Sequence, residues 1–212
     1  MKIVIFGAAG HASAVLDILK QSQQYNIAGF VDSNKALHGK IIDGFTVLGD
    51  ASILDDLYRQ SVKGIIIAIG DNRIRKELAD LVRGKGFCLI NAIHPNAFIA
   101  QNAQIGEGVA IAVGAIICTH AKIGNNTIVN TGAIVEHGCV IGDNVHISPG
   151  VKIAGGTIVG DGTWIGVGST IVQYLKIGKN CVIGAGSVVI ENIPDKVTVV
   201  GVPGKVVKTN ES

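Results

Sequence analysis

The chain has 212 residues, a formal net charge of +2 and 48% hydrophobic residues, but only 16% charged residues and 4% aromatics. This near-neutral balance, without a run of like charges, excludes the footprint of a nucleic-acid binder and a polybasic membrane patch. Residues 1–6 lack the layout of a signal peptide, and no stretch of about 18 apolar residues occurs. We therefore expect a cytoplasmic protein with no membrane partner, whose four cysteines are free thiols.

Residues 1–92 are expected to form a small α/β domain. Apolar strands alternate with segments of helical spacing, which predicts a parallel, Rossmann-like sheet with crossover helices. The expected strands are Lys2–Phe6, Ile27–Val31 and Gly64–Ile69, and the expected helices are Ala12–Lys20, Asp50–Arg59 and a third that runs through Val82.

A glycine-rich turn, residues 7–11, follows the first strand and opens the first helix. The dinucleotide fingerprint G-x-G-x-x-G is not met, because residue 9 is alanine and no third glycine follows, so NAD is not expected. Ligands of open α/β sheets bind beyond the carboxyl ends of the strands. Three clusters fall there and predict a nucleotide-binding crevice, although a purely structural turn remains an alternative: Ala9, Gly10 and His11; Asp32 and Ser33; Gly70, Asp71 and Asn72.

From residue 99 onward an aliphatic residue recurs at every sixth position. The sixteen members are all Ile or Val: Ile99, Ile105, Ile111, Ile117, Ile123, Val129, Val135, Ile141, Ile147, Ile153, Val159, Ile165, Ile171, Ile177, Ile183 and Val189. Period six fits neither a helix nor an alternating strand. It predicts a three-sided prism in which three hexapeptides make one coil of about 18 residues, and coils stack roughly 4.8 Å apart. The spacing alone does not give the handedness.

This repeat resembles that of the hexapeptide, left-handed parallel β-helix acyltransferases. The order of motifs is G-A-A-G-H, G-F-V-D, A-I-G-D-N-R-I-R and I-H-P before the repeats. It resembles the bacterial sugar acetyltransferases of the sialic acid O-acetyltransferase type, which include the UDP-4-amino-sugar (bacillosamine) and perosamine N-acetyltransferases. The end of the chain, residues 201–205, matches their G-x-P-A-K ending except that Gly204 replaces the usual alanine.

The resemblance implies a nucleotide-sugar-binding domain over residues 1–92 and a β-helix acetyltransferase domain with a C-terminal tail over residues 93–212. It implies acetyl-CoA as co-substrate, no metal, and a homotrimer with the acetyl donor between neighbouring coils. The expected activity is acetylation of the amino group of a nucleotide-linked sugar in surface glycan or glycoprotein sugar synthesis. His11, with Ala9, Gly10, Asp32, Ser33 and Gly70, matches the nucleotide-sugar site of the family.

His137 is the candidate general base. It follows Val135 by two positions, and residue 155, one coil further on, is a glycine that would leave open space above the imidazole for a thioester. Imidazole titrates near neutral pH, and the backbone N–H of Gly155 could stabilise an oxyanion. The resemblance supports both roles. In the family an acidic residue commonly follows the histidine, but here that residue is Gly138, so Glu136 or another carboxylate such as Asp143 is the candidate replacement. An exposed histidine without chemistry remains the alternative.

The resemblance also implies that His146 contacts acetyl-CoA, with a subunit-interface histidine as the alternative. It further implies that Val167 and Ala185 meet the pantetheine arm through backbone atoms. Cys139 and Cys181 occupy a small inward position and no cysteine has an adjacent base, so direct attack by the substrate on the thioester is expected.

Three other functions remain open. The acceptor could be the hydroxyl of sialic acid or a related sugar. A zinc hydratase would use His120, His137 and His146, although these lack the short histidine pair that such a site needs. A catalytically inactive sugar-nucleotide-binding scaffold would not bind acetyl-CoA.

Overall fold

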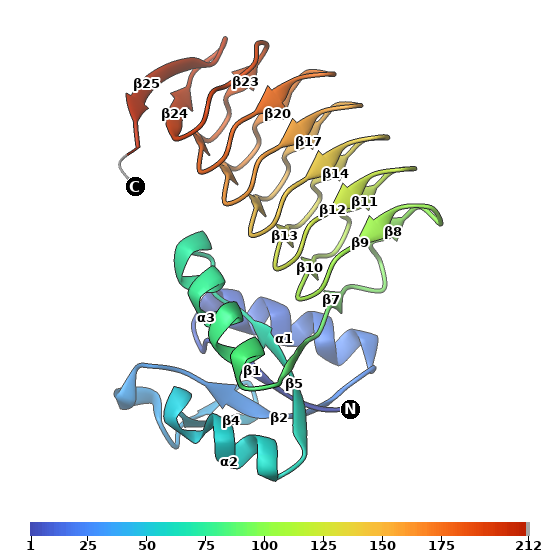
Figure 1. Cartoon of the computed structure of the whole chain (residues 1–212). Coiled ribbons are helices and arrows are strands. Elements are labelled where there is room, and N and C mark those ends of the chain that lie inside the picture. The colour runs from blue at the N-terminus through green and yellow to red at the C-terminus, as the bar shows by residue number, and fades with distance from the viewer. Residues whose placement is uncertain (211–212) are drawn as a thin grey trace. The chain divides into compact units, whose positions relative to one another are not determined.

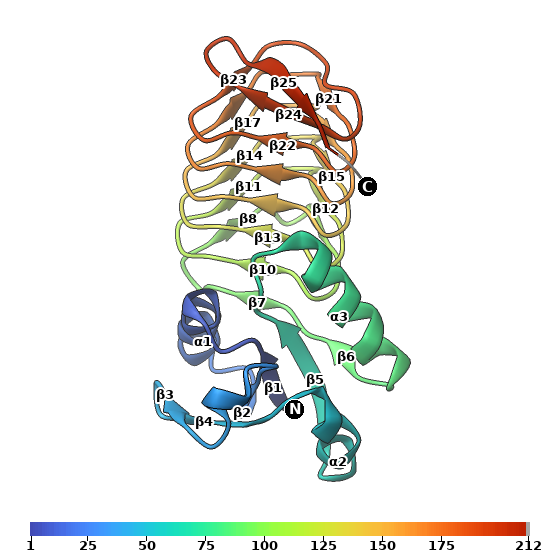
Figure 2. The same ribbon diagram turned by 90° about the vertical axis from the view of Figure 1, so that its left-hand side faces the viewer.

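The computed structural model describes residues 1–210 and contains two compact units, one over Met1–Pro95 and one that begins at Asn96. The first unit is α/β and the second is a stack of short parallel strands (Figures 1 and 2). Its elements confirm the expected fold class of an α/β domain followed by hexapeptide repeats.

The sheet of the first unit has the strand order β3-β4-β2-β1-β5-β6. All neighbouring pairs are parallel except β3 with β4. The first unit contains β1 (Lys2–Phe6), α1 (Gly10–Ser22), β2 (Asn26–Val31), a 3₁₀ turn (Lys35–Leu37), β3 (Ile41–Ile42), β4 (Phe45–Gly49), a 3₁₀ turn (Ala51–Ile53), α2 (Leu54–Arg59), β5 (Val62–Ile67), α3 (Asn72–Gly84), β6 (Cys88–Leu89) and β7 (Ala92–Ile93).

Two details differ from the sequence prediction. The helix expected from residue 50 begins only at Leu54, because the Asp50 carboxylate accepts a bond from the Ser52 N–H and starts a 3₁₀ turn instead. The β3–β4 hairpin was not predicted, although its turn is the dipeptide Asp43-Gly44, with both residues at positive φ. Such Asp-Gly turns favour tight hairpins.

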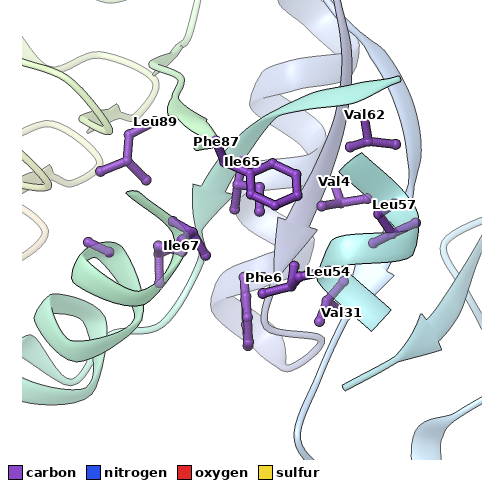
Figure 3. Close-up of a cluster of buried hydrophobic side chains, with 12 residues drawn as sticks. Val4, Phe6, Val31, Leu54, Leu57, Val62, Ile65, Ile67, Phe87 and Leu89 are labelled. Atoms are coloured by element: carbon purple, nitrogen blue, oxygen red, sulfur yellow. The ribbon is translucent and has the colours of Figure 1, made fainter. Parts of the chain in front are cut away.

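The core of this unit packs α2 and α3 against one face of the sheet (Figure 3). Leu54 and Leu57 of α2 approach Val4 and Val62 from β1 and β5. Burial of such side chains is worth about 1.5–3 kcal/mol each. The parallel pairing of β1 with β2 and with β5 places the carboxyl ends of the three strands next to one another.

The second unit contains sixteen two-residue strands between residues 98 and 189, each ending on one aliphatic of the repeat. They are β8 (Phe98–Ile99), β9 (Gln104–Ile105), β10 (Ala110–Ile111), β11 (Ile116–Ile117), β12 (Lys122–Ile123), β13 (Ile128–Val129), β14 (Ile134–Val135), β15 (Val140–Ile141), β16 (His146–Ile147), β17 (Lys152–Ile153), β18 (Ile158–Val159), β19 (Trp164–Ile165), β20 (Thr170–Ile171), β21 (Lys176–Ile177), β22 (Val182–Ile183) and β23 (Val188–Val189). From Ile111 to Val189 every repeat aliphatic is buried.

Each strand from β8 to β20 pairs in parallel with the strand eighteen residues later, as Val129 does with Ile147. Three faces result, which confirms the prism and is typical of the left-handed β-helix. We call them face A (β10, β13, β16, β19, β22), face B (β8, β11, β14, β17, β20, β23) and face C (β9, β12, β15, β18, β21). Strand β24 (Val197–Val200) extends face A, and β25 (Lys205–Thr209) pairs antiparallel with β24.

The turns between faces share one backbone feature that the sequence analysis did not identify. Three residues after each aliphatic, from residue 108 to residue 186, the backbone φ is positive. Glycine and asparagine tolerate this left-handed conformation best. They occupy these positions except for His120 and Tyr174: Gly108, Gly114, Asn126, Gly132, Gly138, Asn144, Gly150, Gly156, Gly162, Gly168, Asn180 and Gly186.

At the edge between faces C and A, called the C–A edge, side-chain oxygens cap backbone N–H groups of the preceding coil. Asp143 Oδ1 accepts the Asn125 N–H at 2.6 Å, and Asp161 Oδ1 accepts the Asp143 N–H at 3.1 Å. A Cβ on Gly124 would lie 2.6 Å from Asp143 Oδ1, so glycine leaves room for the capping carboxylate. The polar side chains of the C–A edge therefore stabilise the stacking of the coils.

Candidate active site

His137 lies on the outside of the prism, on the edge between faces B and C (the B–C edge), and its side chain is exposed. Its imidazole packs against Gly155 one coil later. A Cβ built on Gly155 would lie 2.6 Å from Cε1 and 2.7 Å from Nε2 of His137. The space left by the missing side chain is therefore filled by the imidazole itself, and not open above it as the sequence analysis expected.

The backbone around this pair is held by bonds between coils. The Gly156 N–H donates to the His137 carbonyl at 2.9 Å, and the Tyr174 N–H donates to the Gly155 carbonyl at 3.0 Å. The N–H of Gly155 has no acceptor among residues 1–210. A fixed N–H beside an imidazole is the pair of groups that acyl transfer needs.

Neither of the two carboxylates that the sequence analysis named as partners of His137 bonds to its ring within the described residues. Glu136 Oε2 accepts the backbone N–H of His137 at 3.3 Å, and Asp143 caps Asn125 on the C–A edge. Gly138 occupies a left-handed turn position with φ of 66°, which explains the glycine that follows the histidine. Glu136 therefore holds the main chain that carries the imidazole.

Val167 and Ala185 lie on a different edge, between faces A and B (the A–B edge), and both are exposed. Their backbone N–H groups have no acceptor in the described part of the chain. A Cβ on the neighbouring Gly168 or Gly186 would meet nothing within 4 Å. The A–B edge therefore offers backbone N–H donors next to two exposed glycines, an arrangement that suits an extended ligand with amide carbonyls.

His146 lies on face A, where it pairs with Ile128 on one side and Trp164 on the other, as the 18-residue period predicts. The His146 and Trp164 rings are 6.1 Å apart between centroids, and Trp164 Nε1 donates to Ser148 Oγ at 2.9 Å. Within one chain His137 and His146 thus occupy different surfaces of the prism.

The first unit brings its predicted clusters to one edge of the sheet, because β2, β1 and β5 are parallel neighbours. Asp32 Oδ2 accepts the Ala8 N–H at 2.8 Å and Oδ1 accepts the Asn34 N–H at 2.8 Å, so Asp32 ties two turns together. Ala9, Gly10 and Ser33 are exposed beside it, whereas His11 and Gly70 are partly buried. The N-cap residue of α1, Ala9, has no side chain to cap the helix, and its carbonyl accepts the N–H groups of Ala12 and Ser13 at 2.8 and 3.3 Å. The positive end of the helix dipole at this turn suits an anion.

The sequence analysis missed Arg75, which is only 1% exposed. Its guanidinium donates to the carbonyls of Ile69 and Gly70 at 3.2 and 3.1 Å and to Asn72 Oδ1 at 2.8 Å, which orders the turn after β5. Burial, together with this nearby cation, lowers the pKa of His11 from 6.5 to about 4. His11 is therefore neutral at physiological pH. The position of Arg75 in the sequence of α3 gave no signal that its side chain would be buried.

Cys139 and Cys181 lie inside the prism as predicted, and burial raises the pKa of each thiol. Within residues 1–210 no group of three His, Cys, Asp or Glu side chains could hold a metal ion. In the same range no helix has the length and apolarity required to cross a bilayer.

Family models match both parts of the chain. Residues 2–82 match the PglD N-terminal domain, and residues 120–155 and 156–191 match the bacterial transferase hexapeptide model. Among curated proteins, UDP-N-acetylbacillosamine N-acetyltransferase of Bacillus subtilis is 33% identical over 111 residues. GDP-perosamine N-acetyltransferase of Escherichia coli O157:H7 is 32% identical over 113 residues. The chain spans about half the length of the curated relatives it matches.

Solved structures are similar over nearly the whole chain. PerB from Caulobacter crescentus, in complex with CoA and GDP-perosamine, is 38% identical with a TM-score of 0.93 and coverage of 98% of both chains. The acetyltransferase domain of PglB from Neisseria gonorrhoeae, in complex with acetyl coenzyme A, is 33% identical with a TM-score of 0.90, covering 97% of this chain and 98% of that one.

Proposed function

The chain belongs to the family of bacterial sugar N-acetyltransferases that join a PglD-type N-terminal domain to hexapeptide repeats, and from this we propose that it transfers acetyl from acetyl-CoA to the amino group of a nucleotide-linked amino sugar. The observation that carries the proposal is the imidazole of His137 packed on Gly155, whose N–H has no acceptor in residues 1–210. The proposal includes a cytoplasmic setting and a role in making sugars for surface glycans or glycoproteins.

In this proposal His137 removes the proton from the attacking amine as its nitrogen bonds to the thioester carbonyl carbon. The Gly155 N–H donates to the carbonyl oxygen as negative charge develops there. Loss of one such donor typically costs about 3 kcal/mol. Glu136 keeps the backbone of His137 in place through its N–H. The carbon–sulfur bond then breaks, and the proton held by His137 is available to the departing thiolate.

The acceptor would be held by the first unit. The positive end of the helix dipole at the start of α1, which carries no side-chain cap, suits a diphosphate, and a neutral imidazole such as that of His11 has one donor and one acceptor nitrogen. Asp32, Ser33 and Gly70 border the same edge of the sheet. We propose these residues, with Ala9 and Gly10, as the nucleotide-sugar site.

Acetyl-CoA would need two copies of the chain. An arm bound to the N–H groups of Val167 and Ala185 runs along the A–B edge, and face B separates that edge from His137. A second copy that places its A–B edge against this B–C edge brings the arm and the base together. Such head-to-tail contacts close into a ring when the rotation permits. We therefore propose a homotrimer, with His146 near the donor in the groove between copies.

Two alternatives are tested by the same assay. Wild-type protein is incubated with acetyl-CoA and a panel of UDP- and GDP-linked amino sugars, with sialic acid as the hydroxyl acceptor, and thiol release is followed. The proposal predicts release with at least one nucleotide amino sugar. Release only with sialic acid would establish O-acetylation, and no binding of acetyl-CoA would leave an inactive sugar-nucleotide-binding scaffold.

A further inference from the structure

Tyr174 stands out among the turn residues of the prism. Its φ is 61°, in the left-handed region, where nearly every equivalent turn residue is glycine or asparagine. Its side chain is nevertheless 75% exposed, more than any other large hydrophobic side chain among residues 1–210. A buried packing role therefore does not account for a bulky residue at this strained position.

The ring of Tyr174 packs on a defined part of the backbone. A Cβ on Gly156, one coil earlier, would lie 2.6 Å from Cδ1 and 2.8 Å from Cε1 of Tyr174, so the ring rests on bare backbone. The Tyr174 N–H also donates to the Gly155 carbonyl at 3.0 Å. His137 rests in the same way on Gly155. An imidazole and a phenol thus flank the dipeptide Gly155-Gly156 along one edge.

The height of Tyr174 along the prism axis indicates which part of a neighbouring copy it would face. Tyr174 follows Val167 by seven residues and precedes Ala185 by eleven. At 18 residues and about 4.8 Å per coil it lies about 2 Å above Val167 and about 3 Å below Ala185. In a ring of copies with parallel coil axes, Tyr174 of one copy therefore faces the edge that carries Val167 and Ala185 in the next.

We infer that Tyr174 is a donor-binding residue whose ring covers the pantetheine arm of acetyl-CoA next to the thioester. This inference rests on the proposed function and on the arrangement of copies that it contains. The apolar ring face packs on the arm, and the exposed hydroxyl stays in water. Removal of this contact weakens donor binding and leaves the acceptor site and the imidazole intact.

The test uses Tyr174→Asn, because asparagine occupies the equivalent turn positions 126, 144 and 180 without altering the backbone. Tyr174→Gly is the second variant, and Tyr174→Phe separates the ring from the hydroxyl. The matched control is His120→Asn, which changes the other bulky left-handed residue on the same edge. Initial rates are measured with acetyl-CoA and acceptor varied in turn, CoA affinity is measured by calorimetry, and melting temperatures are recorded.

The expected result is a KM for acetyl-CoA and a Kd for CoA raised about tenfold in Tyr174→Asn and Tyr174→Gly. The KM for the acceptor and the melting temperature should stay unchanged, and Tyr174→Phe and His120→Asn should resemble wild type. Three results would overturn the assignment of Tyr174 without affecting the proposed function, provided that the wild-type protein is active. They are an unchanged KM for acetyl-CoA in Tyr174→Asn, an equal rise in the KM for the acceptor, or a fall in melting temperature large enough to explain the weaker binding. Failure of wild-type protein to bind CoA would overturn the proposed function and this inference together.

Discussion

The imidazole of His137 occupies the place where a side chain on Gly155 would begin, although the two residues are eighteen positions apart. The parallel coils bring them into register, and the Gly156 N–H bond to the His137 carbonyl fixes the distance between their backbones. The base and the N–H donor of the proposed reaction are therefore one structural unit, and a change in either should disturb the other.

Gly155→Ala is predicted to reduce kcat/KM by about 100-fold, because a methyl group at 155 cannot coexist with the present ring position of His137. Circular dichroism and melting temperature should stay close to wild type, since the ring lies outside the prism. Gly84→Ala is the control, because a Cβ there meets nothing within 4 Å. Full activity in Gly155→Ala would show that the contact has no part in catalysis.

His137→Ala is predicted to lower kcat by about 10²- to 10⁴-fold, the range expected for loss of a general base. The KM for acetyl-CoA should change little, because donor binding is assigned to the A–B edge. Steady-state kinetics on both substrates separate the two effects, with His120→Ala as a control on the same edge. A variant that keeps wild-type kcat would remove His137 from the mechanism.

The interior of the prism should dominate the stability of the second unit. Ile165 is fully buried, and Ile165→Ala is predicted to lower the free energy of unfolding by about 2–5 kcal/mol. Ile158→Ala, at a site 41% exposed, should change it by less than about 1 kcal/mol. Denaturant titrations at one protein concentration compare the two, and equal losses would contradict the assignment of inward and outward positions.

His11 should make stability depend on pH. Its folded pKa of about 4 lies below the ordinary 6.5, so the unfolded chain binds a proton that the folded chain does not. Its contribution is fully present above pH 6.5 and is lost progressively as the pH falls toward 4, by up to roughly 3 kcal/mol. His11→Asn should flatten the unfolding free energy over this interval. A curve with the same slope as wild type would mean that another group titrates.

The proposed homotrimer makes a prediction about mixed subunits. Light scattering should give three times the chain mass. His137→Ala damages the B–C edge, and Ala185→Trp is expected to block the A–B edge. Each variant alone should be inactive, but random mixed trimers should recover about a quarter of wild-type activity, because one interface in four joins two intact edges. No recovery in verified mixed trimers would show that one copy contains the whole site.

The period-six repeat let the sequence determine the prism. Sixteen Ile or Val positions predict sixteen inward side chains, and eighteen-residue register follows from three faces. The register placed His137 beside Gly155, His146 beside Trp164 and Val167 beside Ala185 before any coordinates. This works because each coil contacts only its neighbours, so local spacing fixes the contacts between coils.

Other features depended on the tertiary structure. Burial of Arg75 beside His11, and the ring of His137 filling the gap over Gly155, depend on side-chain positions that no spacing reveals. The three edges look equivalent in the repeat, yet on the C–A edge Asp143 and Asp161 each cap an N–H group of the preceding coil, whereas on the B–C edge Glu136 caps its own neighbour His137. The sequence thus determined which residues meet. The packed structure decided which backbone groups remain for a ligand, because hydrogen-bond satisfaction depends on atoms from two coils at once.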